Sequence, residues 1–189
     1  MYVTYNFELH VYVTLTALWK FFHYSSKRAE SLKMVQQVLQ LPELKIAKPS
    51  DTRWLARERC VKAVKENYIA IVITLNNIYE ETNQPEALGI SKALSSKSTI
   101  SAVYLLDFVL PQVAKLSKTL QSEKLDLTVI SSLVEATLYS LDDALSPAAN
   151  WVLELQGMKE SLEEATGVNI TTSDIQTFKI VLEIHLFQL

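Results

Sequence analysis

The residues that could carry chemistry in this chain are few and far apart. The side chains that could bind a soft metal ion are one cysteine and three histidines. None of them lies near another in the sequence at the close spacing that zinc sites use. The three glycines are too scattered for a phosphate-binding loop, and no nucleophilic serine elbow occurs. We therefore expect no metal, cofactor or small-molecule substrate. The four ligand candidates are His10, His23, Cys60 and His185.

Carboxylates are more numerous, and 21 of them could in principle supply a metal-binding pair. The neighbours Asp142-Asp143 and Glu163-Glu164 lie at the polar edge of helical patterns, where acidic side chains are usually hydrated. Asp107 differs because it interrupts an apolar run, where its burial would be costly. We interpret Asp107 as an acidic position opposite the apolar face of a helix, and we expect no catalysis by this chain.

Arg53 and Trp54 are the most informative pair, at the start of a predicted helix behind a connector with two prolines. A tryptophan there can anchor the helix to the core while the arginine reaches water. Alternatively, the indole stacks on a nucleic-acid base and the guanidinium contacts phosphate. The residues alone leave both interpretations open.

Helices must position these residues, because only three glycines and five prolines interrupt a chain that is 49% hydrophobic. Residues 25–39 read as a helix capped by a serine hydroxyl, with a further helix over 15–24. Residues 2–11 alternate apolar and polar side chains with the two-residue period of a strand. Residues 42–51 form an extended connector between prolines.

Two long apolar stripes follow. The first stripe predicts one continuous helix that begins at 50–52 and has its apolar face buried. The second begins at residue 126 and stops at Pro147. The stripes comprise Val61, Val64, Tyr68, Ile71, Leu75 and Ile78 in the first helix, and Leu127, Ile130, Val134, Leu138, Leu141 and Leu145 in the second.

Shorter elements complete the pattern. Pro85 fits the first turn of a short helix that ends in a serine-rich stretch, and Pro111 should kink a helix over 100–121. Val152, Leu155 and Leu162 resume an apolar stripe up to residue 167. The tail has a capping box at Ser173 before a final helix, with a strand as the alternative. We predict one all-α, bundle-like unit over residues 1–189.

Charge is divided unevenly along the chain. Residues 1–67 hold 11 Lys and Arg against 6 Asp and Glu, whereas residues 68–189 hold 7 against 15. A basic first third suits contact with phosphate, although it also fits an ordinary hydrated surface. The single cysteine cannot form an internal disulfide, the apolar runs are far shorter than a membrane span, and the sequence has no signal-peptide pattern. We therefore predict a nuclear or cytoplasmic protein without a membrane segment.

Residues 21–33 (FFHYSSKRAESLK) and 50–61 (SDTRWLARERCV) together resemble a tract of hAT-superfamily transposases and of hAT-derived zinc-finger proteins, and the similarity extends over about residues 20–170. The resemblance implies the helical insertion of a ribonuclease-H-like transposase, whose catalytic Asp, Asp and Glu would lie outside this segment. It also implies that Trp54 stacks on bases of transposon-end DNA, with Arg53 near the backbone. The family's Cys-x-x-His motif is missing here.

Three functions follow in order of preference. The first is a non-catalytic, hAT-derived helical segment that contacts DNA. The alternative is a helical scaffold for protein partners or self-association, without a role in nucleic-acid binding. The third is a metal-dependent nuclease, which would need positioned carboxylates that the sequence does not offer.

Overall fold

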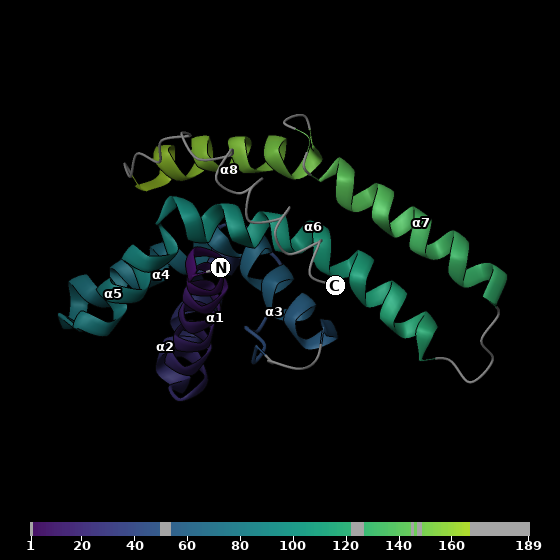
Figure 1. Ribbon diagram of the computed structural model, residues 1–189. Coiled ribbons are helices and arrows are strands. Elements are labelled where there is room, and N and C mark those ends of the chain that lie inside the picture. The colour runs from purple at the N-terminus through teal and green to yellow at the C-terminus, as the bar shows by residue number, and fades with distance from the viewer. Residues whose placement is uncertain (1, 50–53, 122–126, 145, 147–148, 167–189) are drawn as a thin grey trace.

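A computed structural model describes residues 2–49, 54–121, 127–144, 146 and 149–166 (Figure 1). Within these ranges every regular element is an α-helix, so the all-α prediction is confirmed. The tail with its capping box at Ser173, and the predicted start of a helix at 50–52, lie outside the described residues. The helices are α1 Tyr2–His23, α2 Ser26–Val38, α3 Trp54–Glu66, α4 Tyr68–Thr82, α5 Pro85–Leu94, α6 Lys97–Leu120, α7 Leu127–Asp143 and α8 Asn150–Thr166.

The strand-like alternation of residues 2–11 is misleading, because α1 runs through the whole segment from Tyr2. Further along α1 the buried side chains include Val11, Leu15, Leu18 and Phe22. These positions repeat at spacings of four, three and four residues, which is the pattern of one helix face. The two-residue period was therefore incidental to a helical segment.

The turn from α1 to α2 follows the predicted capping rule. Ser25 has an extended backbone, and its hydroxyl accepts the backbone N–H of Arg28 at 3.3 Å. The Arg28 guanidinium donates to the carbonyl of Phe21 at 3.1 Å and lies 4.0 Å from the centre of the Phe21 ring. These contacts hold the end of α1 against the start of α2.

The first apolar stripe is buried as predicted, but the single long helix is wrong. The helix is interrupted at Asn67, so α3 and α4 are two separate helices. Asn67 is buried, donates to the Ala63 carbonyl at 3.3 Å and accepts from the side-chain amide of Gln36 at 2.9 Å. A buried amide needs such partners, and Gln36 on α2 supplies one. Val61, Val64, Tyr68, Ile71, Leu75 and Ile78 are all buried.

Two prolines behave differently in the next helices. Pro85 occupies the first turn of α5, as predicted, after Asn83 turns the chain with a left-handed backbone. Ser96 then caps α6 by accepting the Thr99 N–H at 3.3 Å, so α6 begins three residues earlier than predicted. Pro111 lies inside α6, and the helix continues past it to Leu120.

Helix α6 is the centre of the fold. In Figure 1, α7 and α8 cover one side of it, while α3 and the α1–α2 hairpin lie on the other side. With 24 residues α6 is long and apolar enough to cross a membrane by length and composition, which its short apolar runs did not suggest. Half of its most apolar stretch is buried inside the protein, as in the core helix of a compact bundle.

The second apolar stripe, on α7, is confirmed at three of its described positions and wrong at Leu138, while the Leu127 side chain and Leu145 lie outside the described part. Leu141 is buried and Ile130 and Val134 are half-buried, but Leu138 is 57% exposed whereas Thr137 is only 6% exposed. One residue corresponds to about 100° around a helix, so the buried seam is turned away from Leu138 toward Thr137. A threonine fits there because its hydroxyl donates to the carbonyl of Leu133 at 2.7 Å.

The interruption between the last two helices agrees with the prediction, since α7 ends at Asp143 and α8 begins at Asn150. Pro147 itself lies outside the described residues. The Trp151 indole N–H donates to the carbonyl of Ala144 at 3.0 Å and joins the two helix ends. Val152 and Leu155 are buried as the stripe predicts.

Candidate functional site

The structure describes only part of the predicted DNA-contacting pair, Arg53 and Trp54. Arg53 lies outside the described residues, and Trp54 is the first residue of α3, with its side chain outside the described part. The surface near this pair in the chain is described. Lys45 and Lys48 in the connector and Arg59 and Lys62 on α3 are all exposed.

Most exposed cations on α1, α2, the connector and α3 form no ion pair with the carboxylates that the structure describes. Lys20, Lys27, Lys45 and Arg59 are exposed, and none forms an ion pair within the described residues. Two other exposed lysines do, since Lys33 pairs with Glu43 at 3.3 Å and Lys62 with Glu66 at 3.8 Å. Both pairs are exposed to water and are worth little energetically. Within the described part of the chain, this surface therefore keeps unpaired positive charge.

Opposite this surface, α7 and α8 are acidic. Helix α7 contains no basic residue, and Glu135, Asp142 and Asp143 are exposed. On α8, Glu160 and Glu164 are exposed, and Lys159 is the one basic residue of that helix. The Asp142-Asp143 pair is thus hydrated, as predicted. The charge asymmetry of the sequence becomes a separation across α6 in space (Figure 1).

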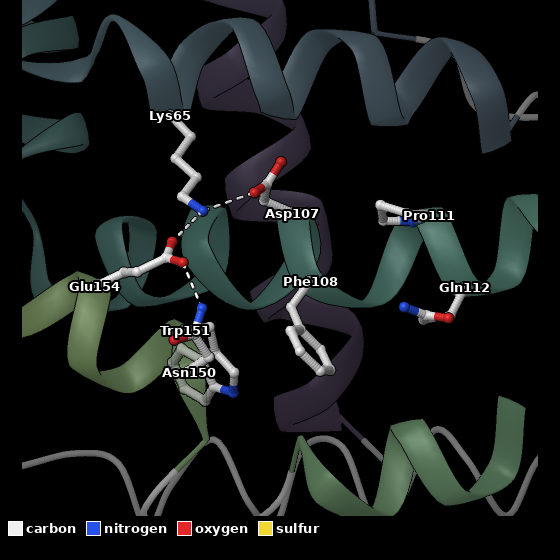
Figure 2. Close-up of a pocket in the computed structure, with 8 residues that line it drawn as sticks. All are labelled: Lys65, Asp107, Phe108, Pro111, Gln112, Asn150, Trp151 and Glu154. Carbon is white, nitrogen blue, oxygen red and sulfur yellow. Dashed lines mark hydrogen bonds and ion pairs between the residues drawn. The ribbon is translucent and has the colours of Figure 1, made fainter. Parts of the chain in front are cut away.

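Asp107 is not isolated, because Lys65 reaches it from α3. The Lys65 ammonium lies 2.7 Å from an Asp107 oxygen and 2.5 Å from an oxygen of Glu154 on α8, as Figure 2 shows. Asn150 donates to the other Glu154 oxygen at 2.6 Å. The sequence could not predict this group, since its members are 42 and 89 residues apart.

Lys65 is held in its charged form. Burial alone would lower the pKa of Lys65, but hydrogen bonds to Asp107 and Glu154 outweigh it, and the pKa is raised. The Tyr104 ring lies 5.1 Å from the ammonium and adds a favourable contact. A lysine that acts as a nucleophile needs a neutral amine. This lysine instead ties α3, α6 and α8 together.

A shallow pocket of about 220 Å³ opens beside this ion-paired group. It lies below the volume typical of small-molecule sites, roughly 300–1,000 Å³. The charged groups in its wall already bind one another. The pocket is therefore a poor candidate for substrate binding. Its walls are Lys65, Asp107, Phe108, Pro111, Gln112, Asn150, Trp151 and Glu154 (Figure 2).

Of the four soft ligand candidates, the structure describes the side chains of Cys60 and His23, while that of His10 lies outside the described part. Cys60 is buried, and burial raises the pKa of its thiol to about 12, so it is an unreactive thiol at neutral pH. His23 is exposed, and His185 lies outside the described residues. No group of three or more His, Cys, Asp or Glu side chains that could hold a metal occurs among the described residues.

Comparison of the chain with protein-family models, with curated proteins and with solved structures finds no match.

Proposed function

We propose that this chain is a non-catalytic helical segment derived from a hAT transposase, and that it contacts DNA through the basic side of its fold. The observation that carries the proposal is the separation of charge across α6. Exposed cations that form no ion pair with any described carboxylate lie on α1, α2, the connector and α3, whereas α7 and α8 expose mainly acids. A phosphate backbone is attracted to the first surface and repelled by the second.

The sequence resemblance agrees with this orientation. The Thr52-Arg53-Trp54 motif lies in the chain between Lys48 of the connector and Arg59 of α3, both exposed cations. In the proposal, Trp54 stacks on a base and Arg53 contacts the backbone, and the protein acts in the nucleus. Catalytic carboxylates are not part of the proposed role.

The test is DNA binding measured by fluorescence anisotropy at several salt concentrations. Lys20→Glu combined with Lys27→Glu should weaken binding strongly and flatten the salt dependence, because each lost phosphate contact removes released counterions. Lys92→Glu with Lys115→Glu makes the same charge change at exposed lysines of α5 and α6 and should have a much smaller effect. Equal effects of both pairs would show that only net charge matters, against the proposal.

Arg53 and Trp54 need a test that separates binding from folding. Trp54→Ala should weaken binding to a single-stranded or branched DNA end by ~1–3 kcal/mol, the usual value of one stacked base. Arg53→Ala should lower affinity with a shallower salt dependence. A Trp54→Ala variant that is destabilised while the wild type binds no DNA at low salt would identify the indole as a core anchor.

A second candidate function, the protein-interaction scaffold, is favoured by one observation. Val129, Leu138 and Tyr139 on α7 and Leu153 on α8 are each more than half exposed, although α7 and α8 also expose many charges. Light scattering over a range of concentrations tests for self-association. Association that is lost in Leu138→Ser would support this function over the first.

A further inference from the structure

A cluster of aromatic rings lies on the surface at the end of α1. The Trp19 and His23 rings are stacked, with centroids 4.7 Å apart and an angle of 22° between their planes. Tyr24 meets both rings edge-on, at 5.9 Å from Trp19 and 5.0 Å from His23. His23 is exposed and Tyr24 is 74% exposed, whereas Trp19 is half-buried, so the cluster turns two of its three rings to water.

The core does not need the His23 and Tyr24 rings, because both are exposed. The neighbouring Phe21 and Phe22 point inward and are buried, and they provide the aromatic packing of this turn. Exposed aromatic rings forgo the large gain that burial would bring, since each can bury about 150–250 Å². A cluster that keeps them at the surface is suited to a ligand that stacks on rings.

Positive charge surrounds the cluster. The Lys48 ammonium, from the connector, lies 5.4 Å from the centre of the Trp19 ring. Lys20, in the same turn of α1, is exposed and forms no ion pair within the described residues. A ligand for this surface must offer both flat rings and negative charge. Nucleic acid has both at every nucleotide, whereas an acidic peptide such as poly-glutamate offers the charge alone.

The form of nucleic acid follows from the need for open base faces. Bases in a duplex are stacked on each other, so a surface aromatic ring reaches them only in single strands, ends or distorted sites. Arg53 follows Lys48 by five residues, which can span at most roughly 17 Å of extended chain. A strand of a few nucleotides could therefore contact both this cluster and the Arg53-Trp54 pair.

We propose that Trp19, His23 and Tyr24, with Lys20 and Lys48, form a base-stacking site for single-stranded nucleic acid. This inference rests on the proposed DNA-contacting function and adds a site to it that the sequence pattern did not indicate.

The experiment is titration of the full chain with a dye-labelled oligo-dT of about 16 nucleotides, long enough for one such surface. Tyr24→Ala should raise the dissociation constant at least about fivefold, as expected for one lost base stack. Tyr24→Phe keeps the ring and should bind within about twofold of the wild type. Tyr139→Ala is the matched control, because Tyr139 is 78% exposed on the acidic helix α7, and it should leave binding unchanged.

The outcomes separate this inference from the function on which it rests. If the wild type binds oligo-dT and Tyr24→Ala binds equally well, the stacking site is wrong while the DNA-contacting function stands. Poly-glutamate and unlabelled oligo-dT can be compared as competitors of the labelled oligo-dT. If both displace it equally well, the surface recognises charge alone, and the stacking site is again wrong. If the wild type binds no nucleic acid at low salt, both proposals fall.

Discussion

Helices α4 and α7 have similar apolar patterns, yet α4 is buried far more extensively than α7. Seven residues of α4 are buried, and it packs on α2, α3, α5 and α8. Among the described side chains of α7 only Thr137 and Leu141 are buried, and the helix packs mainly on α6. An apolar stripe therefore predicts which face of a helix is turned inward, while the number of neighbouring helices decides how deeply that face is buried.

Truncation in α4 should give the largest loss of stability. Ile71 is fully buried, so Ile71→Ala removes apolar contacts and leaves a cavity, at a cost of about 2–5 kcal/mol. The free energy of unfolding from urea titration measures this cost. A loss below ~1 kcal/mol would show that α4 is no better packed than α7.

Removing Lys65 should have the next largest effect. Lys65→Met leaves Asp107 without its partner in a half-buried place, and we expect a loss of about 1–3 kcal/mol. Adding Asp107→Leu should recover much of the loss, because the unpaired carboxylate is then gone. Failure of the double variant to recover would indicate that Lys65 contributes through the packing of its aliphatic stem.

The sequence predicts features of this fold that depend on near neighbours in the chain. The Ser25 cap and Pro85 in the first turn of α5 are local and were predicted correctly. The break at Asn67 was not, because its side chain is satisfied by Gln36, 31 residues earlier. The partners of Asp107 likewise come from other helices. Of the proposed stacking site, only the four-residue spacing of Trp19 and His23 could have been noticed.

Alkaline pH offers a smaller effect that is specific to the well-packed side of the fold. The pKa of Cys60 rises from 9.0 to about 12 on burial. The pKa of the thiol is higher in the folded protein than in the unfolded chain. The contribution of the buried, protonated thiol to stability is therefore complete below pH 9 and is lost as the pH rises toward 12.

Between pH 8 and pH 10 the free energy of unfolding of the wild type should therefore fall by about 1 kcal/mol more than that of Cys60→Ala. The variant has no thiol to ionise in the unfolded chain. Urea titrations of both proteins across this range give the two slopes. Identical slopes would mean that the thiol is accessible to water.

Leu138→Ala should give the smallest effect, below ~0.5 kcal/mol, because that side chain is mostly exposed. Its comparison with Ile71→Ala is the sharpest measure of the difference between α7 and α4. A loss of 2 kcal/mol or more would show that a partner or a second copy covers α7 in solution.

The most direct test of the account is a map of the nucleic-acid contact by backbone NMR of the labelled protein titrated with oligo-dT at low salt. We predict that signals shift for the end of α1, the start of α2, the connector and the first turns of α3, while those of α7 and α8 stay in place. Shifts concentrated in α7 and α8, or no shifts at saturating oligonucleotide, would contradict the account.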